Sequence, residues 1–327
     1  MKELLNKKIG EILVNCNVKG VCIAIIDNFK VDFCKPFGFA DSKKQEKITK
    51  NTLFQVASIS KPVFACGVMS LYNKGLIDIQ CDIDEYLKTW KLERIPYRRV
   101  SIENLLSHNG GTTVGGFKGY QQGEKLPTTL DILNGQGNSE KIVCNIPSYS
   151  YSGGGYTVLQ YIIEEIFGDF SNFMQKEVFD IVGMENSKYF TSLTSLDKLA
   201  SENYNLYPEF AAAGLYSTAY DLTNLGIFLQ KQLLGEGIIK KEIVEKFLTR
   251  INDGYHGLGF RISQDGNVFW HGGINNDFYS HFVFTKDGRG IVILTNGNSR
   301  EVFDKLENLI KDFYNWNDIV LNSFNSK

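Results

Sequence analysis

The stretch that decides the fold reads Phe54-Gln55-Val56-Ala57-Ser58-Ile59-Ser60-Lys61-Pro62. It joins a short apolar run, which ends at Ala57, to a longer apolar segment whose spacing predicts a helix over residues 58–74. Pro62 is compatible with that helix only in its first turn, where amide groups have no partner within the helix. The helix is therefore expected to begin near Ser58 and to place this serine at its positive end.

Ser58 and Lys61 form a Ser-x-x-Lys pattern, and residues three apart share one face of a helix. A serine hydroxyl is a poor nucleophile until a base takes its proton. A nearby ammonium favours the alkoxide and any anionic base, and the Ser58 amide can donate to a developing oxyanion. The pattern occurs again at Ser195–Lys198, and by itself it more often marks a helix start with a solvated lysine. Only Ser58 lies between an apolar run and a long apolar helix, which favours it as the nucleophile.

The rest of the chain divides by apolar periodicity into strands at its two ends and helices in its middle. The pattern predicts an amphipathic helix over 3–15, a β-hairpin over 21–34 and a final helix that begins near Val302. Further helices are predicted at 101–106, 156–167, 170–181, 219–234 and 240–249, and further strands at 258–262, 268–270, 278–284 and 290–294.

Consecutive strands that are separated by short turns favour an antiparallel sheet, and the terminal helices can cover one of its faces. The expected fold class is α+β, with an antiparallel sheet flanked by helices beside a mostly helical domain. Residues 1–80 and 250–327 would form a discontinuous sheet domain, and residues 81–249 the helical domain. The active site is expected between the two domains, where pockets commonly form.

Composition excludes several classes of protein. The chain has 327 residues, 35 basic and 37 acidic, and this balance argues against a general nucleic-acid binder. No apolar run approaches the roughly 20 residues that a membrane span needs. Apolar and charged residues interleave at the N-terminus, which is not typical of a secretory signal. The expected location is cytoplasmic, or exported with a leader that is absent from this chain.

No motif for a metal or cofactor is present in the sequence. The six cysteines form no C-x-x-C pair, the four histidines form no H-E-x-x-H pattern, and both nucleotide-binding glycine motifs are missing. We therefore expect no cofactor and no metal. The expected partner is a small-molecule acyl substrate, and the oligomeric state stays open.

Five segments together resemble the class C β-lactamase-like serine hydrolases, which include penicillin-binding D-Ala-D-Ala carboxypeptidases, β-lactamases and related esterases. Besides the Ser58 segment they are Leu105–Gly111, Tyr151–Tyr156, Ala213–Thr218 and His271–Gly273. Their order and spacing match over roughly residues 20–300. The resemblance implies a β-lactamase/transpeptidase-like fold and acyl transfer to water through an acyl-enzyme.

The resemblance also implies roles for individual residues. Ser58 would attack, and Tyr151 with Lys61 would move its proton. His271 could hydrogen-bond Tyr151 or the substrate. The amides of Ser58 and Ile274 would hold the oxyanion. Gly272 and Gly273 would let substrate approach the strand, and the motif is expected to follow a strand that ends at Trp270.

Three departures from the family pattern bear on the substrate. Gly153 stands where the family has an asparagine that contacts substrate, Gly272 lacks a hydroxyl, and His271 replaces a lysine. They point away from β-lactams and towards small esters or D-amino-acid-type amides. The alternatives are a β-lactamase and a non-catalytic binding or sensor protein that kept the fold. The sequence gives His108 no task beyond anchoring a loop, and it favours structural roles for His256 and His281.

Overall fold

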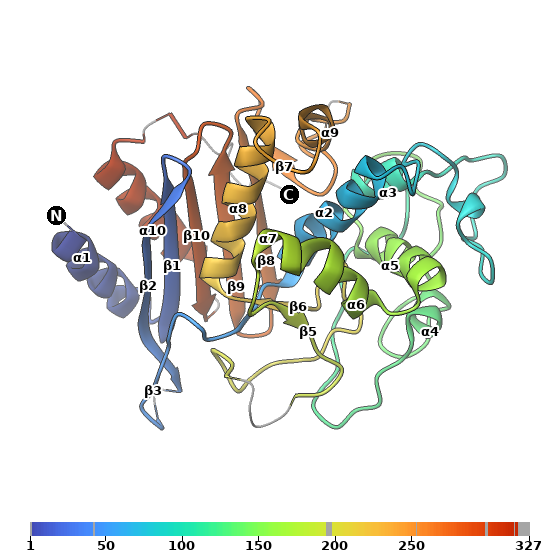
Figure 1. Ribbon diagram of the computed structural model, residues 1–327. Coiled ribbons are helices and arrows are strands. Elements are labelled where there is room, and N and C mark those ends of the chain that lie inside the picture. The colour runs from blue at the N-terminus through green and yellow to red at the C-terminus, as the bar shows by residue number, and fades with distance from the viewer. Residues whose placement is uncertain are drawn as a thin grey trace.

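The computed structural model describes residues 2–41, 43–193, 198–252, 254–297, 300–316 and 318–319. Within these ranges the main element is a seven-stranded antiparallel sheet in the order β3-β2-β1-β10-β9-β8-β7 (Figure 1). Its strands are β1 (Gly20–Asp27), β2 (Lys30–Asp41), β3 (Glu46–Lys47), β7 (Arg261–Ile262), β8 (Val268–Asn275), β9 (Phe278–Thr285) and β10 (Gly290–Asn296). The early hairpin and the late strands thus join one sheet, as predicted.

Helical segments fill the middle of the chain and both of its ends. They are α1 (Lys2–Asn15), η1 (Ala57–Ile59), α2 (Ser60–Asn73), η2 (Ile83–Glu85), α3 (Ile102–Leu106), α4 (Thr129–Leu133), α5 (Gly153–Phe167), α6 (Phe170–Met174), η3 (Gln175–Phe179), α7 (Asp180–Val182), α8 (Ala219–Leu233), α9 (Lys241–Phe247) and α10 (Arg300–Tyr314). Figure 1 shows α2, α3, α5 and α6 gathered beside the sheet. The predicted α+β class is therefore confirmed.

The sheet is apolar on both faces because helices cover both. On β1, Val21 and Ile23 belong to the core that α1 and α10 close, whereas Cys22 and Ala24 belong to the core beneath α8. Alternate residues of a strand point to opposite faces, so a strand buried on both sides is a continuous apolar run. The core beneath α8 continues without a break into α2, α3 and α5.

The helix α8 lies on the sheet although its residues fall in the predicted helical domain. It packs against β1 and β10 and crosses one face of the sheet in Figure 1. The division into domains 1–80 with 250–327 and 81–249 stays a prediction.

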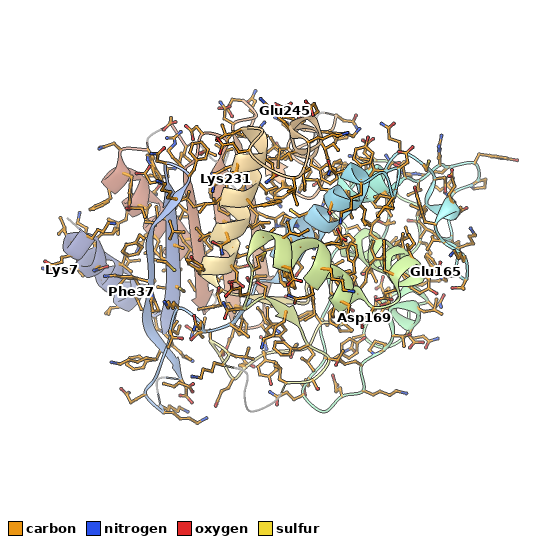
Figure 2. All side chains as sticks on the ribbon, viewed as in Figure 1. Lys7, Phe37, Glu165, Asp169, Lys231 and Glu245 are labelled. Carbon is orange, nitrogen blue, oxygen red and sulfur yellow. The ribbon has the colours of Figure 1, made fainter. Side chains whose placement is uncertain are left out.

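Charged side chains such as Lys7 on α1 and Lys231 on α8 point outwards in Figure 2, as an amphipathic surface helix requires.

Several predicted boundaries differ from the structure. The helix predicted from Ser58 begins at Ser60, and Ser58 lies in the short turn η1 before it. The helix predicted from residue 156 begins at Gly153, because the Ser152 hydroxyl caps it by accepting from the Gly155 amide at 3.0 Å. The strand predicted to end at Trp270 continues to Asn275. The strand predicted over 258–262 contains only β7, its last two residues.

A second, three-stranded sheet was not predicted. Its order is β4 (Phe54–Gln55), β6 (Leu215–Ser217) and β5 (Lys188–Tyr189). Strands of two or three residues are too short to show a period, so the sequence carries no signal for them. This small sheet brings the Ala213–Thr218 segment to the start of the Ser58 turn. No helix in the part of the chain that the structure describes is long and apolar enough to cross a membrane.

Candidate active site

The turn that carries Ser58 is fixed from both sides. Gln55 of β4 pairs with Tyr216 of β6, and the Val56 amide donates to the Leu215 carbonyl at 3.1 Å. Ala57 then adopts a φ of +47°, a left-handed conformation that residues with a side chain rarely take. Such a conformation persists where the surrounding structure enforces it. At Ala57 it changes the direction of the chain between β4 and α2, and Ser58 lies at this bend.

Lys61 is the buried cation of the site. Its side chain follows Ser58 by one helical turn and is only 2 % exposed. Its Nζ donates to the Ser58 Oγ at 3.2 Å and to the Ala212 carbonyl at 2.7 Å. A buried ammonium needs such acceptors, because leaving water without them is costly. The predicted pairing of the serine and the lysine of this motif is therefore present in the structure.

Ser60 ties the turn to the small sheet. Its Oγ donates to the Ala57 carbonyl at 2.6 Å and accepts from the Leu215 amide at 3.0 Å. The Leu215 carbonyl also accepts from the Val56 amide. Leu215 is therefore hydrogen-bonded to the chain on both sides of Ser58. Sequence reasoning assigned Ser60 no such role, because nothing local shows that the two segments meet.

Tyr151 is brought to the same place from another part of the chain. It directly precedes Ser152, the residue that caps α5. The Lys61 Nζ lies 5.0 Å from the centre of the Tyr151 ring. Tyr151 and Ser58 both line the cavity described below.

His271 lies inside β8, opposite Phe282 of β9. Its Nδ1 is 2.8 Å from the Gly272 carbonyl, which can only accept, so Nδ1 carries the proton and Nε2 keeps its lone pair. The ring centres of His271 and Tyr151 are 6.3 Å apart. Burial lowers the pKa of His271 well below its usual value, and the nearby Arg261 and Lys61 cations act in the same direction. The imidazole is thus neutral and cannot replace the family's lysine as a cation.

A cavity of about 680 Å³ extends from this cluster towards α10. Its walls at the Ser58 end are formed by Ser58, Tyr151, His271, Gly272, Gly273 and Ile274. At the other end they include the charged side chains Arg300, Asp304, Glu307 and Lys311 of α10. The cavity therefore joins the serine to a region that carries both signs of charge.

Gly273 has a structural reason to lack a side chain. A Cβ on it would lie 2.2 Å from the Val56 carbonyl, 2.6 Å from the Ser280 Oγ and 2.9 Å from the Ser58 amide nitrogen. The strand β8 thus packs directly against the backbone of the Ser58 turn. The Ile274 side chain, in contrast, is 60 % exposed at the cavity wall. The oxyanion role of the Ser58 and Ile274 amides stays a prediction.

Replacing Gly273 by alanine is expected to lower both the thermal unfolding midpoint and the reactivity of Ser58. The added methyl group meets backbone atoms on the turn, which cannot move aside cheaply, and such overpacking typically costs roughly 1–3 kcal/mol. Thermal unfolding and the rate of covalent labelling by a fluorophosphonate probe check the prediction. Gly116→Ala, whose Cβ would meet no atom within 4 Å, is the matched control. Wild-type labelling and stability in Gly273→Ala would contradict it.

Gly153 is buried at the start of α5, beneath the loop over residues 115–117. A Cβ there would be 2.8 Å from the Phe117 ring and 3.3 Å from the Gly115 carbonyl, and the residue is buried beneath that loop. It is absent from the described walls of the cavity, which argues against a contact with substrate. The family's asparagine would have to displace Phe117, so the loop over 115–117 takes the space that an amide side chain would need.

Three histidines that sequence reasoning left without a catalytic role lie close to the site. The His108 and His256 rings are 4.3 and 5.9 Å from the Tyr151 ring, and His281 lines the cavity. Burial lowers the pKa of His256 and of His281 to about 3 in each case, and that of His108 well below its usual value. Single histidines in separate segments show no pattern that predicts such a cluster. The structure arranges no group of three or more His, Cys, Asp or Glu side chains for a metal ion among its described residues.

These histidines predict a loss of stability in acid. The unfolded chain takes up protons on its four histidines as the pH falls below about 6.5, whereas the folded protein keeps them neutral to much lower pH. The folded state therefore binds fewer protons, and the free energy of unfolding falls as the pH drops, by at most about 1.4 kcal/mol per pH unit for each histidine. Urea unfolding at pH 7.5, 6.0 and 5.0 checks this. An unfolding midpoint that stays constant over this range would contradict it.

The second Ser-x-x-Lys pattern gives no competing site. Ser195 and the two residues after it lie outside the described residues. Lys198 is exposed, and its carbonyl accepts from the Leu53 amide at 2.8 Å.

Comparison with known proteins agrees with the fold and with the motifs. The sequence model of the family described as Beta-lactamase matches residues 5–314. Penicillin-binding protein 4* of Bacillus subtilis is 26 % identical over 64 % of this chain, and the match covers 47 % of that relative, about half its length. The teichoic acid D-alanine hydrolase of Staphylococcus aureus (strain MRSA252) is 23 % identical over 96 % of this chain and 80 % of its own length.

Two solved structures illustrate that the fold is shared with other proteins. The octameric penicillin-binding protein homologue from Pyrococcus abyssi has a TM-score of 0.79 at 20 % identity and covers 96 % of this chain and 77 % of its own. The D-amino acid amidase from Ochrobactrum anthropi SV3 has a TM-score of 0.74 at 20 % identity and covers 94 % and 99 %. The predicted β-lactamase/transpeptidase-like fold is confirmed.

Proposed function

Since the chain belongs to the Beta-lactamase family, whose members are serine hydrolases, we propose that it cleaves small esters or D-amino-acid-type amides through an acyl-enzyme on Ser58. The observation that carries this proposal is the buried Lys61 ammonium, which donates to the Ser58 Oγ at 3.2 Å beside a cavity. A lysine that served only as a helix-start residue would lie in solvent. Burial beside a serine fits the activation of a nucleophile.

The geometry supports a two-step reaction. The Ser58 Oγ attacks the substrate carbonyl carbon while its proton passes to the oxygen of a Tyr151 phenolate, whose ring lies beside the Lys61 ammonium. The amides of Ser58 and Ile274 would stabilise the oxyanion, and Tyr151 would then protonate the leaving alcohol or amine. Water attacks the acyl-enzyme in the second step, and its proton takes the reverse path back to Ser58.

The choice of substrate rests on the cavity and on the relatives. The site offers no lysine in β8, and Gly272 lacks the hydroxyl that often holds the substrate carboxylate in the family. Instead, carboxylates and cations of α10 line the far end of the cavity. A D-amino acyl ester or amide carries its ammonium on the carbon next to the attacked carbonyl, and its acyl part has no carboxylate that the lysine or the hydroxyl would have to hold. One relative is named a teichoic acid D-alanine hydrolase and one structural neighbour a D-amino acid amidase, which agrees with this chemistry.

The test is a substrate comparison with purified protein. We expect D-alanine esters and D-amino-acid amides to be hydrolysed faster than a chromogenic cephalosporin, with the L-enantiomers as matched control substrates. Ser58→Ala, measured beside the wild type, separates enzymatic turnover from spontaneous hydrolysis. Faster turnover of the cephalosporin would make β-lactams the better substrate class, and no Ser58-dependent turnover of any of them would contradict the proposal.

A further inference from the structure

The ring of Tyr151 has to be held in place by other residues. Tyr151 is half-buried, it precedes α5 rather than lying within it, and no hydrogen bond to its hydroxyl comes from any residue that the structure describes. A proton carrier must stay within reach of the serine, since a displacement of about 1 Å can cost about 100-fold in rate. A neighbouring residue must therefore fix the position of the Tyr151 ring.

His108 contacts Tyr151 and both residues that flank it. The His108 carbonyl accepts from the Ser150 amide at 3.0 Å, and the His108 Nδ1 accepts from the Ser152 amide at 3.1 Å. Between these two bonds, the His108 ring packs on the Tyr151 ring with centres 4.3 Å apart and planes at 35°. One residue thus holds the backbone on each side of Tyr151 and one face of its ring.

The backbone of His108 is bent to reach this position. His108 follows α3, and its amide donates to the Leu105 carbonyl at 3.3 Å. Its φ is +62°, in the left-handed region that favours glycine, although its side chain is 98 % buried. A glycine would relieve this conformation but would supply neither the ring nor the Nδ1 acceptor. A strained backbone of this kind is kept where the side chain has a task.

The bond to Ser152 also fixes the charge and tautomer of His108. An amide can only donate, so Nδ1 holds a lone pair and the proton of the neutral ring is on Nε2. The cations of Lys61 and Arg261 and the rings of His256 and His271 face His108 and disfavour its protonation, as does its burial. The contact with Ser152 is therefore maintained at neutral pH.

We propose that His108 is a positioning residue that fixes the Tyr151 ring for proton transfer with Ser58. The inference rests on the proposed function, because it gives His108 a role only through Tyr151. His108 does not touch the reacting atoms in this role. Its removal should lower the turnover rate while leaving substrate binding nearly unchanged.

Two substitutions separate the contacts of His108. His108→Phe keeps a ring against Tyr151 but removes the acceptor for Ser152, whereas His108→Asn keeps an acceptor and tolerates positive φ but removes the ring. We expect each to lower kcat, and the rate of labelling by a fluorophosphonate, by roughly 10- to 100-fold, with KM changed less than about twofold. Ser101→Ala, which removes the cap of α3 without touching Tyr151, is the control for lost stability alone and should leave kcat unchanged.

The decisive measurement repeats His108→Phe in a Tyr151→Phe background. If His108 acts through Tyr151, His108→Phe causes no further loss of labelling rate in the Tyr151→Phe background. An equal loss in the wild-type and Tyr151→Phe backgrounds would overturn the inference. Wild-type kcat in both His108→Phe and His108→Asn would also overturn it. A wild type that the probe does not label contradicts the proposed function instead. In that case a crystal structure of His108→Asn still tests the inference, since an unmoved Tyr151 ring would overturn it and a displaced ring would support it.

Discussion

Lys61→Met is expected to lower the rate at which Ser58 is acylated by about 1,000-fold, within the range typical of lost proton-transfer catalysis. Methionine has a similar length and suits a buried site, so the helix should still form. It cannot donate to the Ser58 Oγ or to the Ala212 carbonyl, the two acceptors of Lys61. The Ser58 hydroxyl would lose its neighbouring cation, and the Tyr151 ring would lose the ammonium that lies 5.0 Å from its centre. Labelling with a fluorophosphonate, with circular dichroism to verify folding, measures this effect.

Lys198→Met is the matched control for that prediction. It removes the exposed lysine of the second Ser-x-x-Lys pattern and should leave labelling unchanged. Equal labelling rates in Lys61→Met and in the wild type would show that the buried ammonium does not activate Ser58. A folded Lys61→Met protein is required for that comparison, because loss of a buried charge also leaves the Ala212 carbonyl without its donor.

Tyr151→Phe is expected to lower kcat by about 100- to 1,000-fold with little change in KM, since it removes only the oxygen that carries the proton. The ring, its contact with His108 and its place beside Lys61 would remain. Steady-state kinetics with the best ester of the substrate panel measures the effect. Tyr149→Phe removes the equivalent oxygen two residues away, where it bonds the His256 Nδ1 at 2.9 Å, and should retain most activity. Similar losses in the two variants would argue against a special role for Tyr151.

The sheet could be predicted from the sequence because its strands are long and apolar. β1 and β10 are buried on both faces, so they are continuous apolar runs bounded by turn residues. The ends of the elements were less predictable. The glycines at 153–155 disfavour a helix by propensity, yet Ser152 caps one there, and tertiary contacts decide the outcome. The continuation of β8 past Trp270 depends on its pairing with β9, which local sequence does not show.

Part of the candidate site could be predicted because two of its residues are close in the sequence. Ser58 and Lys61 lie one turn apart, so their contact follows from helix geometry. Tyr151 and His271 were found through motifs that the family shares, since no local pattern links them to Ser58. The positions of Ser60, His108 and His256 beside the site depend on contacts between distant segments. The packing of Gly153 beneath the Phe117 loop could not be predicted, because that loop has no periodic signal.

Intact-mass spectrometry after treatment with a fluorophosphonate, on the wild type and on Ser58→Ala, shows whether Ser58 is an activated nucleophile. We expect one adduct on the wild type and none on the variant, because only Ser58 has the buried Lys61 ammonium at its hydroxyl. An unmodified, folded wild type would contradict an activated serine and would favour a binding protein that kept the fold. An adduct that persists in Ser58→Ala would place the reactive group elsewhere in the chain.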